Sequence, residues 1–381
     1  MKFIHTSDWH IGRLFQNISL LEDQLFVLQQ LKHYLSEHKV DALVVAGDIY
    51  DRSVPPADAV AALNLFLDEV LTDLKLPVIM ISGNHDSAKR LGFAAKHMQQ
   101  SGLHILSDIA DVTQPVIIET ASGPVQFYGI PYHDPVTVRE CFECEAKTYD
   151  DAHTYLVNLI KTEQQAGIPA VLISHCFIDG ASESESERPL SIGGADRVSF
   201  QPLASFDYVA LGHLHAPQYK GEEHIRYSGS LLKYSFSEYK QKKGVTLVEM
   251  NESGLVSQQH LPLQAKHNLR ILEGELEALL QQAASDQNSD DYLLVRLTDT
   301  HDILDPMGQL RAVYPNVLQL ERSQFNVNVD NRLISDVSLK RSEQQVFSDF
   351  FQQVAGQELS EQQHELLLAA INEAKQTLAG Q

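Results

Sequence analysis

The chain has 381 residues, of which 29 are Lys or Arg and 51 are Asp or Glu, giving a formal net charge of -22 at pH 7. This charge opposes unassisted binding to nucleic acid or to an anionic membrane, so a polyanionic substrate would require a basic partner or a local basic patch. The length allows one large catalytic domain with one or two smaller units.

The cysteine content argues against a disulfide-stabilised protein. Among 3 cysteines, Cys141 and Cys144 form one C-x-x-C pair without the second pair that a structural zinc site needs. Metal binding or redox chemistry by this pair is the weaker alternative to reduced thiols. We therefore expect a cytoplasmic protein, and because no apolar run is long enough to cross a bilayer, we expect no membrane association.

Short β-rich runs followed at once by polar residues dominate the first two thirds of the chain. The runs predicted as strands are residues 3–4, 42–45, 78–81, 171–173 and 208–211. Between the first three runs, apolar residues recur at helical spacing from Leu20 to Leu35 and from Ala59 to Val70. These segments predict crossover helices that cover a parallel sheet, although a dimer-forming face would have the same periodicity.

A second sheet is expected after Pro115. Residues 116–118 and 125–128, separated by a turn at residues 122–124, predict a β-hairpin. Residues 245–248 then predict the strand that closes the catalytic domain.

A polar, acidic segment separates the last two β-rich runs. Glutamates and serines alternate from Ser182 to Glu187, within a stretch from residue 179 to residue 189 that predicts a loop. This loop is either a solvated linker or, because it lies between two histidine clusters, a loop near the mouth of an active site.

Beyond residue 266 the pattern predicts a small α/β module. Runs at 269–272, 292–297 and 317–320 predict strands, and a short helix passes through Leu276 and Leu280. The module carries no metal-like cluster, so we expect it to cover the site or to select substrate.

Two capping signals predict a helical hairpin in the tail. Ser342 with Gln345 opens one helix, and Ser360 with Gln363 opens another. Two short helices cannot form an independent core, so their apolar faces dock either on the rest of the protein or in a groove of a partner. The expected domains are a catalytic domain at 1–266, a capping domain at 267–335 and a partner-binding tail at 336–381.

Polar clusters at the strand ends together predict a two-metal hydrolytic site. In chain order they are Asp8-Trp9-His10, Gly47-Asp48-Ile49-Tyr50-Asp51-Arg52, Gly83-Asn84-His85-Asp86, Ser174-His175 and Gly212-His213-Leu214-His215. Ligands bind at the carboxyl ends of strands in open α/β sheets. A carboxylate can bridge two cations, while imidazoles and an amide oxygen fill the other positions without excess negative charge. Each cluster alone is commonly a satisfied turn or a packed histidine, so the prediction depends on all of them in order.

With these clusters in place, the chain resembles the calcineurin-like metallophosphoesterases, and within them the bacterial Mre-type nuclease subunits that work with an SbcC-type ATPase. Three further segments carry the resemblance: residues 184–189 followed by Gly193-Gly194, residues 211–218, and residues 227–238. The motifs cover the first two thirds of the chain, whereas the rest matches mainly in size and order. The resemblance implies an α/β fold, a four-layer αββα sandwich with a small α/β capping domain and a C-terminal helical hairpin.

The resemblance also implies two divalent metal ions, with Mn(2+) expected. One cation would be held by Asp8, His10 and His215 and the other by Asn84, His175 and His213, with Asp48 bridging both. Mixed imidazole and oxygen ligands suit manganese, although zinc or copper would compete on affinity alone. A bridging carboxylate keeps two cations about 3.5 to 4 Å apart, a spacing that can clamp a phosphodiester.

Three residues that are not ligands acquire catalytic roles from the same resemblance. His85 would lie beside the phosphate, where it stabilises developing charge or protonates the leaving oxygen. The archaeal nucleases of this type carry a histidine where this chain has Asp51, and the Asp51-Arg52 pair instead resembles that of the serine/threonine phosphatases. We therefore expect Asp51 to orient His85 and Arg52 to contact phosphate.

The implied function is a metal-dependent DNA nuclease, with 3'-5' exonuclease activity on double strands and endonuclease activity on single strands or hairpins. It would work with an SbcC-type ATPase, in a heterotetramer containing a dimer of this chain, in DNA end processing, recombination, repair and replication. One alternative is a phosphoesterase acting on a phosphoprotein or a small nucleotide, which has little need for a partner-binding tail. The other is a scaffold without turnover, which retention of every expected ligand disfavours.

Overall fold

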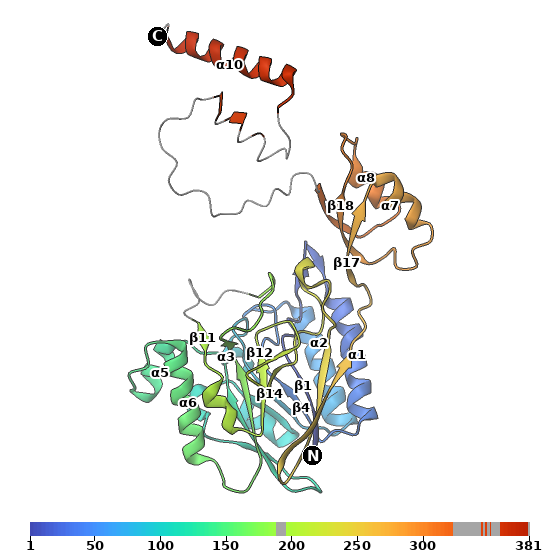
Figure 1. The fold of residues 1–381 in the computed structure, drawn as a ribbon. Coiled ribbons are helices and arrows are strands. Elements are labelled where there is room, and N and C mark those ends of the chain that lie inside the picture. The colour runs from blue at the N-terminus through green and yellow to red at the C-terminus, as the bar shows by residue number, and fades with distance from the viewer. Residues whose placement is uncertain (188–195, 323–343, 346, 349–350, 352–358, 380–381) are drawn as a thin grey trace. The chain divides into compact units, whose positions relative to one another are not determined.

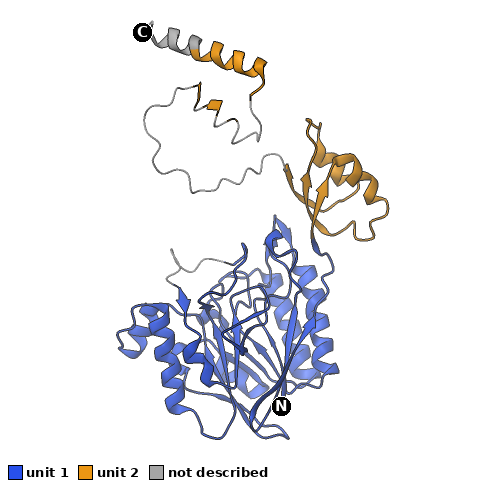
Figure 2. Ribbon diagram, viewed as in Figure 1, with its two compact units in different colours: residues 1–269 blue, residues 270–381 orange. Residues whose placement is uncertain are grey.

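A computed structural model divides the chain into two compact units, residues 1–269 and residues 270–381 (Figure 2). The structure describes residues 1–187, 196–322, 344–345, 347–348, 351 and 359–379 (Figure 1). Within these residues, no helix is both long and apolar enough to cross a membrane.

The first sheet of unit 1 has six strands in the order β16-β15-β1-β4-β5-β6. Their bounds are β1 Lys2–Thr6, β4 Ala42–Val45, β5 Val78–Ile81, β6 Leu103–Leu106, β15 Gly244–Asn251 and β16 Gly254–Pro262. Strands β1, β4, β5 and β6 run parallel, and β15 pairs antiparallel with both β1 and β16. The strand predicted at 245–248 is thus β15, but β16 follows it, so β15 is not the last strand of the catalytic unit.

The second sheet also has six strands, in the order β13-β14-β12-β9-β8-β7. Their bounds are β7 Val116–Ile118, β8 Val125–Ile130, β9 Ala170–His175, β12 Tyr208–Gly212, β13 Gln218–Lys220 and β14 Glu222–Tyr227. The expected hairpin is the antiparallel pair β7 and β8, whereas β8, β9, β12 and β14 run parallel. Two short ribbons complete the strands of unit 1: β2 Leu14–Phe15 with β3 Ile18–Ser19, and β10 Phe177–Ile178 with β11 Arg197–Val198.

The two sheets pack face to face through a fully buried apolar layer. Phe3 of β1 contacts Phe127 of β8 and Tyr208 of β12 edge to face, with ring centroids 5.4 and 5.7 Å apart. Burial of the whole apolar layer, to which these rings contribute, is the main term that holds the sheets together. The prediction of a second sheet is confirmed.

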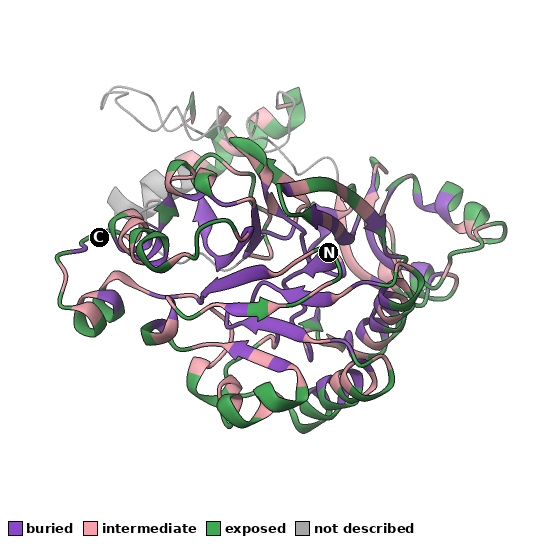
Figure 3. Cartoon of the chain, turned by 90° about the horizontal axis from the view of Figure 1, so that it is seen from below, coloured by how far each residue is buried: buried purple, intermediate pink, exposed green. Residues whose placement is uncertain are grey.

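Helices cover the outer faces of both sheets. Helices α1 Leu21–Glu37 and α2 Ala57–Asp68 lie beside the first sheet, and α5 Pro135–Phe142 and α6 Tyr149–Glu163 pack on the second. Buried strands therefore lie between helices whose outer surfaces are exposed (Figure 3). The four-layer αββα sandwich expected from the resemblance is confirmed.

Short helical segments lie in the connections between the strands and helices of unit 1. They are η1 Glu69–Asp73, α3 Ala88–Leu91, α4 Ala95–Met98, η2 Gln99–Ser101, η3 Ile109–Asp111, η5 Gln201–Ser205 and η6 Phe236–Glu238. Among them, α3 bears on the candidate site, because it begins directly after the polar cluster that follows β5.

Unit 2 contains a three-stranded sheet in the order β17-β18-β19. The elements are β17 Leu269–Gly274, α7 Leu276–Ala283, β18 Tyr292–Leu297, α8 Pro306–Arg311 and β19 Val317–Arg322. Leu279 of α7 and Leu310 of α8 pack with Val295 of β18 in one apolar cluster. The strands expected at 269–272, 292–297 and 317–320 are all present, and α8 is an additional helix.

The tail contains α10 Glu361–Ala379. Its start has the expected reciprocal cap: the Ser360 N–H donates to Gln363 Oε1 at 2.9 Å, and the Gln363 N–H donates to Ser360 Oγ at 3.4 Å. The helix predicted from Ser342 to Gly356 falls mainly outside the described residues.

Candidate metal centre

The polar clusters converge because the loops after β1 and β4 stay paired beyond the ends of these strands. The Asp8 N–H donates to the Gly47 carbonyl at 3.0 Å, and the His10 N–H donates to the Asp48 carbonyl at 2.9 Å. In the second sheet, the register places His175 opposite Gly212, directly before His213. Side chains from two sheets thus meet at the carboxyl ends of their strands.

The backbone around this centre is unusually crowded and contorted. Asp8, His10 and Asp48 have positive φ values of 54°, 46° and 50°, which only a well-supported loop sustains for side chains of this kind. A Cβ atom on Gly83 would lie 2.1 Å from Asp48 Oδ1. Glycine is therefore required there for the close approach of the two loops.

A first group of potential ligands consists of Asp8, His10 and His215, whose ligating atoms lie within 4.8 Å of one another. His10 Nε2 faces His215 Nε2 at 3.1 Å. Both side chains are buried.

A second group forms around the amide oxygen of Asn84. This Oδ1 atom lies 2.9 Å from His175 Nε2 and 3.2 Å from His213 Nδ1. The Nδ2 atom of Asn84 is buried and has no hydrogen-bond partner. The second group thus directs one oxygen and two imidazoles toward one point.

Asp48 lies between the two groups. Its Oδ2 atom is 3.6 Å from His10 Nε2 and 3.5 Å from His175 Nε2, while its Oδ1 atom accepts the His85 N–H at 2.8 Å. One carboxylate oxygen is therefore equally close to an imidazole of each group.

The electrostatics of the centre fit divalent cations. Burial and the neighbouring Asp48 carboxylate raise the pKa of Asp8 well above its usual range, so a nearby positive charge would relieve a real penalty. Burial lowers the pKa of His10, His175 and His213, which keeps these imidazoles in the neutral form that binds metal. Carboxylate, amide and imidazole donors together form a set that divalent first-row metals accept.

His85 contacts Asp51 through the main chain of that residue. Its Nδ1 atom donates to the carbonyl oxygen of Asp51 at 2.8 Å. The Asp51 carboxylate instead lies 3.2 Å from Arg13 Nη1 and 3.8 Å from His10 Nδ1. The orienting role of Asp51 therefore stays a prediction, and the contact available for it is the carbonyl oxygen rather than the carboxylate.

Arg52 remains available for a substrate. Its side chain is 51% exposed, and its Nη2 atom lies 3.9 Å from Asp51 Oδ2, at the limit of an ion pair. Surface pairs of this kind contribute little, so the guanidinium can turn toward a phosphate without a large loss.

Gln24 of α1, which the sequence did not single out, supports the first ligand loop. Its Nε2 donates to the carbonyl oxygens of Trp9 and His10, and its Oε1 accepts the Gly12 N–H at 2.9 Å. Gln24 could have been recognised in the sequence as a polar residue within the apolar stripe of this helix.

Asp86 joins the second and third clusters. Its carboxylate accepts the N–H groups of Ile49, Tyr50 and Gly83 at 2.9 to 3.0 Å. Burial and the Asp48 charge raise its pKa to about 7. Asp86 therefore fixes the loops that carry Asp48 and Asn84 against each other.

The described part of the acidic loop, residues 182–187, lies against the metal centre. Ser186 Oγ is 2.6 Å from His215 Nδ1, and Glu187 Oε1 accepts the His215 N–H at 2.7 Å. Of the two interpretations left open, the loop near the active site applies to these residues, and residues 188–195 lie outside the described part.

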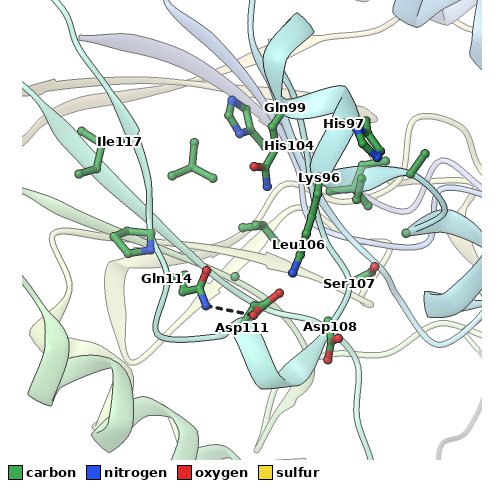
Figure 4. A pocket seen from close by; sticks show the side chains of 17 residues that line it. Lys96, His97, Gln99, His104, Leu106, Ser107, Asp108, Asp111, Gln114 and Ile117 are labelled. Atoms are coloured by element: carbon green, nitrogen blue, oxygen red, sulfur yellow. Dashed lines mark hydrogen bonds between the residues drawn. The ribbon is translucent and has the colours of Figure 1, made fainter.

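A separate hollow lies along the edge strands β6 and β7, where no candidate ligand lines it (Figure 4). Its polar lining includes Lys96 and His97 of α4, Asp108, and Asp111, whose Oδ1 accepts Gln114 Nε2 at 3.1 Å. Its mixed charges give no clear preference for a ligand.

Comparison with known proteins places this geometry in a family. A family model described as calcineurin-like phosphoesterase matches residues 1–217. The chain belongs to the calcineurin-like phosphoesterases. A second model, described as the type 5 capsule protein repressor C-terminal domain, matches residues 265–355 of this phosphoesterase.

Sequence relatives point the same way. Over 365 residues, this phosphoesterase is 34% identical to the SbcD subunit of the nuclease SbcCD from Staphylococcus epidermidis, a match that covers 95% of the chain and 96% of the relative. The expected resemblance to SbcD is confirmed, and the reaction class of the family is hydrolysis of phosphoester bonds.

Solved structures with lower similarity include TT1561 of Thermus thermophilus and a dimetal phosphatase from Danio rerio. Both are 13% identical with a TM-score of 0.39, and they cover 68% and 69% of this phosphoesterase and 98% and 99% of the solved chains.

Proposed function

We propose that the chain is a two-metal nuclease subunit that hydrolyses phosphodiester bonds in DNA. The observation that carries the proposal is the place of Asp48 Oδ2, 3.6 Å from His10 Nε2 and 3.5 Å from His175 Nε2. In this assignment Asp8, His10 and His215 would hold one cation and Asn84, His175 and His213 the other, with Asp48 as a ligand that both would share. When bound, the cations supply Lewis-acid activation of the phosphodiester and of the attacking water.

His85 serves as the general acid. Because its Nδ1 proton is donated to the Asp51 carbonyl, the other ring nitrogen, Nε2, is the atom left to exchange a proton with substrate. In its protonated form, His85 donates from Nε2 to the leaving oxygen. Arg52 contacts a non-bridging phosphate oxygen, and Asp51 holds Arg13 in place.

The similarity to the SbcD subunit of the nuclease SbcCD supports the proposal that DNA is the substrate and an SbcC-type ATPase the partner. The formal net charge of -22 supports this arrangement, since a chain this acidic grips a long polyanion poorly without a companion. The heterotetramer with a dimer of this chain, manganese as the working metal, and the exonuclease and endonuclease activities belong to the same proposal. So do residues 267–335 as the DNA-selecting domain and 336–381 as the ATPase-binding tail.

The test uses the purified protein with Mn(2+) and labelled linear duplex, hairpin and single-stranded DNA, with and without the ATPase and ATP. We expect metal-dependent cleavage of DNA and of bis-p-nitrophenyl phosphate, and loss of both in Asp48→Asn. Preference for p-nitrophenyl phosphate without DNA cleavage would instead identify a monoester phosphatase. No hydrolysis of either compound would identify an inert scaffold.

A further inference from the structure

The two ring nitrogens of His215 face different surroundings. Its Nε2 atom points toward His10 in the first ligand group, whereas its Nδ1 atom lies 2.6 Å from Ser186 Oγ. Ser186 Oγ in turn donates to Glu238 Oε1, which is itself 3.4 Å from the same Nδ1 atom. A chain of hydrogen bonds from His215 to Ser186 to Glu238 leaves the Nε2 lone pair free for a cation.

Glu238 is itself held by a buried lysine. Its Oε2 atom lies 2.5 Å from Lys243 Nζ, and the two side chains are 0% and 5% exposed. Lys243 Nζ also donates to the main-chain oxygen of His215 and to Ser230 Oγ, both at 2.8 Å. This ion pair therefore contacts the side chain of residue 215 at one end and its backbone at the other.

His215, together with Arg13, also anchors residues 182–187. Besides the Ser186 contact, Glu187 Oε1 accepts the His215 N–H, and Arg13 Nη2 donates to the Ser186 carbonyl at 3.2 Å. The Arg13 guanidinium lies 4.9 Å above the ring of Tyr234 and also bonds Asp51. Undocking the loop would thus remove the acceptor that fixes the His215 ring.

We propose that Ser186, Glu238 and Lys243 are positioning residues that fix His215 for its cation, so that metal binding in this half of the centre and docking of residues 182–187 are coupled. The inference rests on the proposed function and deepens it, because it makes the affinity of one of the two metal sites depend on docking of residues 182–187. Partners behind a ligating histidine fix its tautomer and ring orientation, and their loss commonly weakens metal binding by about 10- to 100-fold.

The first test compares Ser186→Ala with Ser182→Ala in the full-length protein. Ser182 is exposed on the same loop, and only its main chain takes part in the hydrogen bonds that it makes with Gln218. Calorimetric titration with Mn(2+) should give two sites in the wild type and in Ser182→Ala. In Ser186→Ala, we expect one site to weaken about tenfold or more while the other is unchanged.

Protease sensitivity measures the coupling between metal binding and docking of residues 182–187 without depending on catalysis. Glutamyl endopeptidase cleaves after glutamates such as Glu183 and Glu185, which are exposed. Saturating Mn(2+) should slow cleavage at these positions in the wild type and should protect them much less in Ser186→Ala.

A pair of substitutions that removes both charges of the buried ion pair tests the same inference with less risk of misfolding. Glu238→Gln alone leaves the Lys243 charge buried and unpaired, so Glu238→Gln with Lys243→Gln is the appropriate variant. It should show the same selective loss of one Mn(2+) site, with the metal-free circular dichroism spectrum of the wild type. Unchanged two-site binding and unchanged protection in Ser186→Ala would overturn the inference and leave the proposed function intact. A wild type that binds no Mn(2+) would overturn the proposed function itself.

Discussion

At the scale of single residues, His85 is fixed at one ring nitrogen and free at the other. The Asp51 carbonyl accepts its Nδ1 proton at 2.8 Å, and none of the ligand assignments requires the His85 ring. Its role in proton transfer can therefore be separated from metal binding.

We expect His85→Asn to lower the rate of bis-p-nitrophenyl phosphate hydrolysis by about a hundredfold or more, the usual loss for a general acid. Mn(2+) binding by calorimetry should stay at the wild-type affinity. His97→Asn, at an exposed position of α4, is the matched control and should retain the wild-type rate. Full activity of His85→Asn would remove this residue from the mechanism.

Another single residue, His153, is a buried histidine outside the metal centre. Its Nε2 atom lies 3.3 Å from Ser174 Oγ, and its ring stacks on His133 with centroids 5.6 Å apart. Burial, followed by the nearby His133, lowers the pKa of His153 from 6.5 to about 3. The unfolded chain binds this proton near pH 6.5 but the folded chain does not, so acid selectively stabilises the unfolded state.

It follows that His153 makes the protein less stable as the pH falls from 6.5 toward 3. We expect the free energy of unfolding of the wild type, relative to His153→Gln, to drop by roughly 2 kcal/mol between pH 8 and pH 5. Urea unfolding in EDTA at the two pH values measures this difference. A relative stability that does not change with pH would show that folding leaves the pKa of His153 at its value in the unfolded chain.

At the scale of elements, α1 does more than cover a sheet. Its Gln24 side chain satisfies the carbonyl oxygens of Trp9 and His10 and the Gly12 N–H, in a loop that has positive φ at Asp8 and His10. The helix thus stabilises a strained turn that holds two candidate ligands.

Replacing Gln24 with Ala should lower the free energy of unfolding by about 2 kcal/mol or more, since it leaves buried main-chain groups without partners. It should also weaken Mn(2+) binding, because the loop relaxes. Chemical denaturation in EDTA and metal titration test the two effects separately. Gln29→Ala, at an exposed position of the same helix, should change neither.

Prediction from sequence succeeded best for strands that are buried throughout. Residues 42–45 and 78–81 coincide with β4 and β5, because an unbroken apolar run there reflects burial on both faces. Helix α6 was missed although Thr148 and Asp151 form a capping box at its start. Its buried face includes His153, a polar residue that interrupts the apolar periodicity.

For the candidate site, residue types at strand ends predicted which clusters meet. Glu238 lies in the segment 227–238 that carries the resemblance, but the sequence predicted neither its role nor that of Lys243. Their role depends on burial and on contact with Ser186, 52 positions before Glu238. Burial alone would raise the pKa of Glu238, but Lys243 and His215 hold it well below its usual range. Nothing in a linear pattern distinguishes such a pair from a solvated surface pair.

At the scale of the whole molecule, the catalytic unit and the tail carry separate tasks in the proposed function. On α10, Leu366 is 71% exposed, so this apolar side chain is accessible to a groove of a partner. Because Leu366 lies in unit 2, its loss should leave the metal centre of unit 1 intact.

We expect Leu366→Arg to weaken binding of the ATPase at least tenfold, as loss of a central apolar anchor commonly does, while hydrolysis of bis-p-nitrophenyl phosphate is unchanged. Glu361→Arg introduces the same side chain on another face of α10 and should bind normally. Binding by surface plasmon resonance decides between these outcomes, and equal affinities for Leu366→Arg and the wild type would give α10 another task.

The order of the strands also constrains how the protein is made. Strand β1 pairs with β15, so Lys2 cannot pair with Glu249 until residue 249 has left the ribosome. Likewise, Asn84 cannot contact His213 until a further 129 residues have been synthesised. At ordinary translation rates this second interval lasts on the order of ten seconds. A nascent chain therefore exposes Asp8, His10, Asp48 and Asn84 long before His175, His213 and His215 have been synthesised. It cannot bind a metal ion in a complete site until most of the phosphoesterase unit has been made.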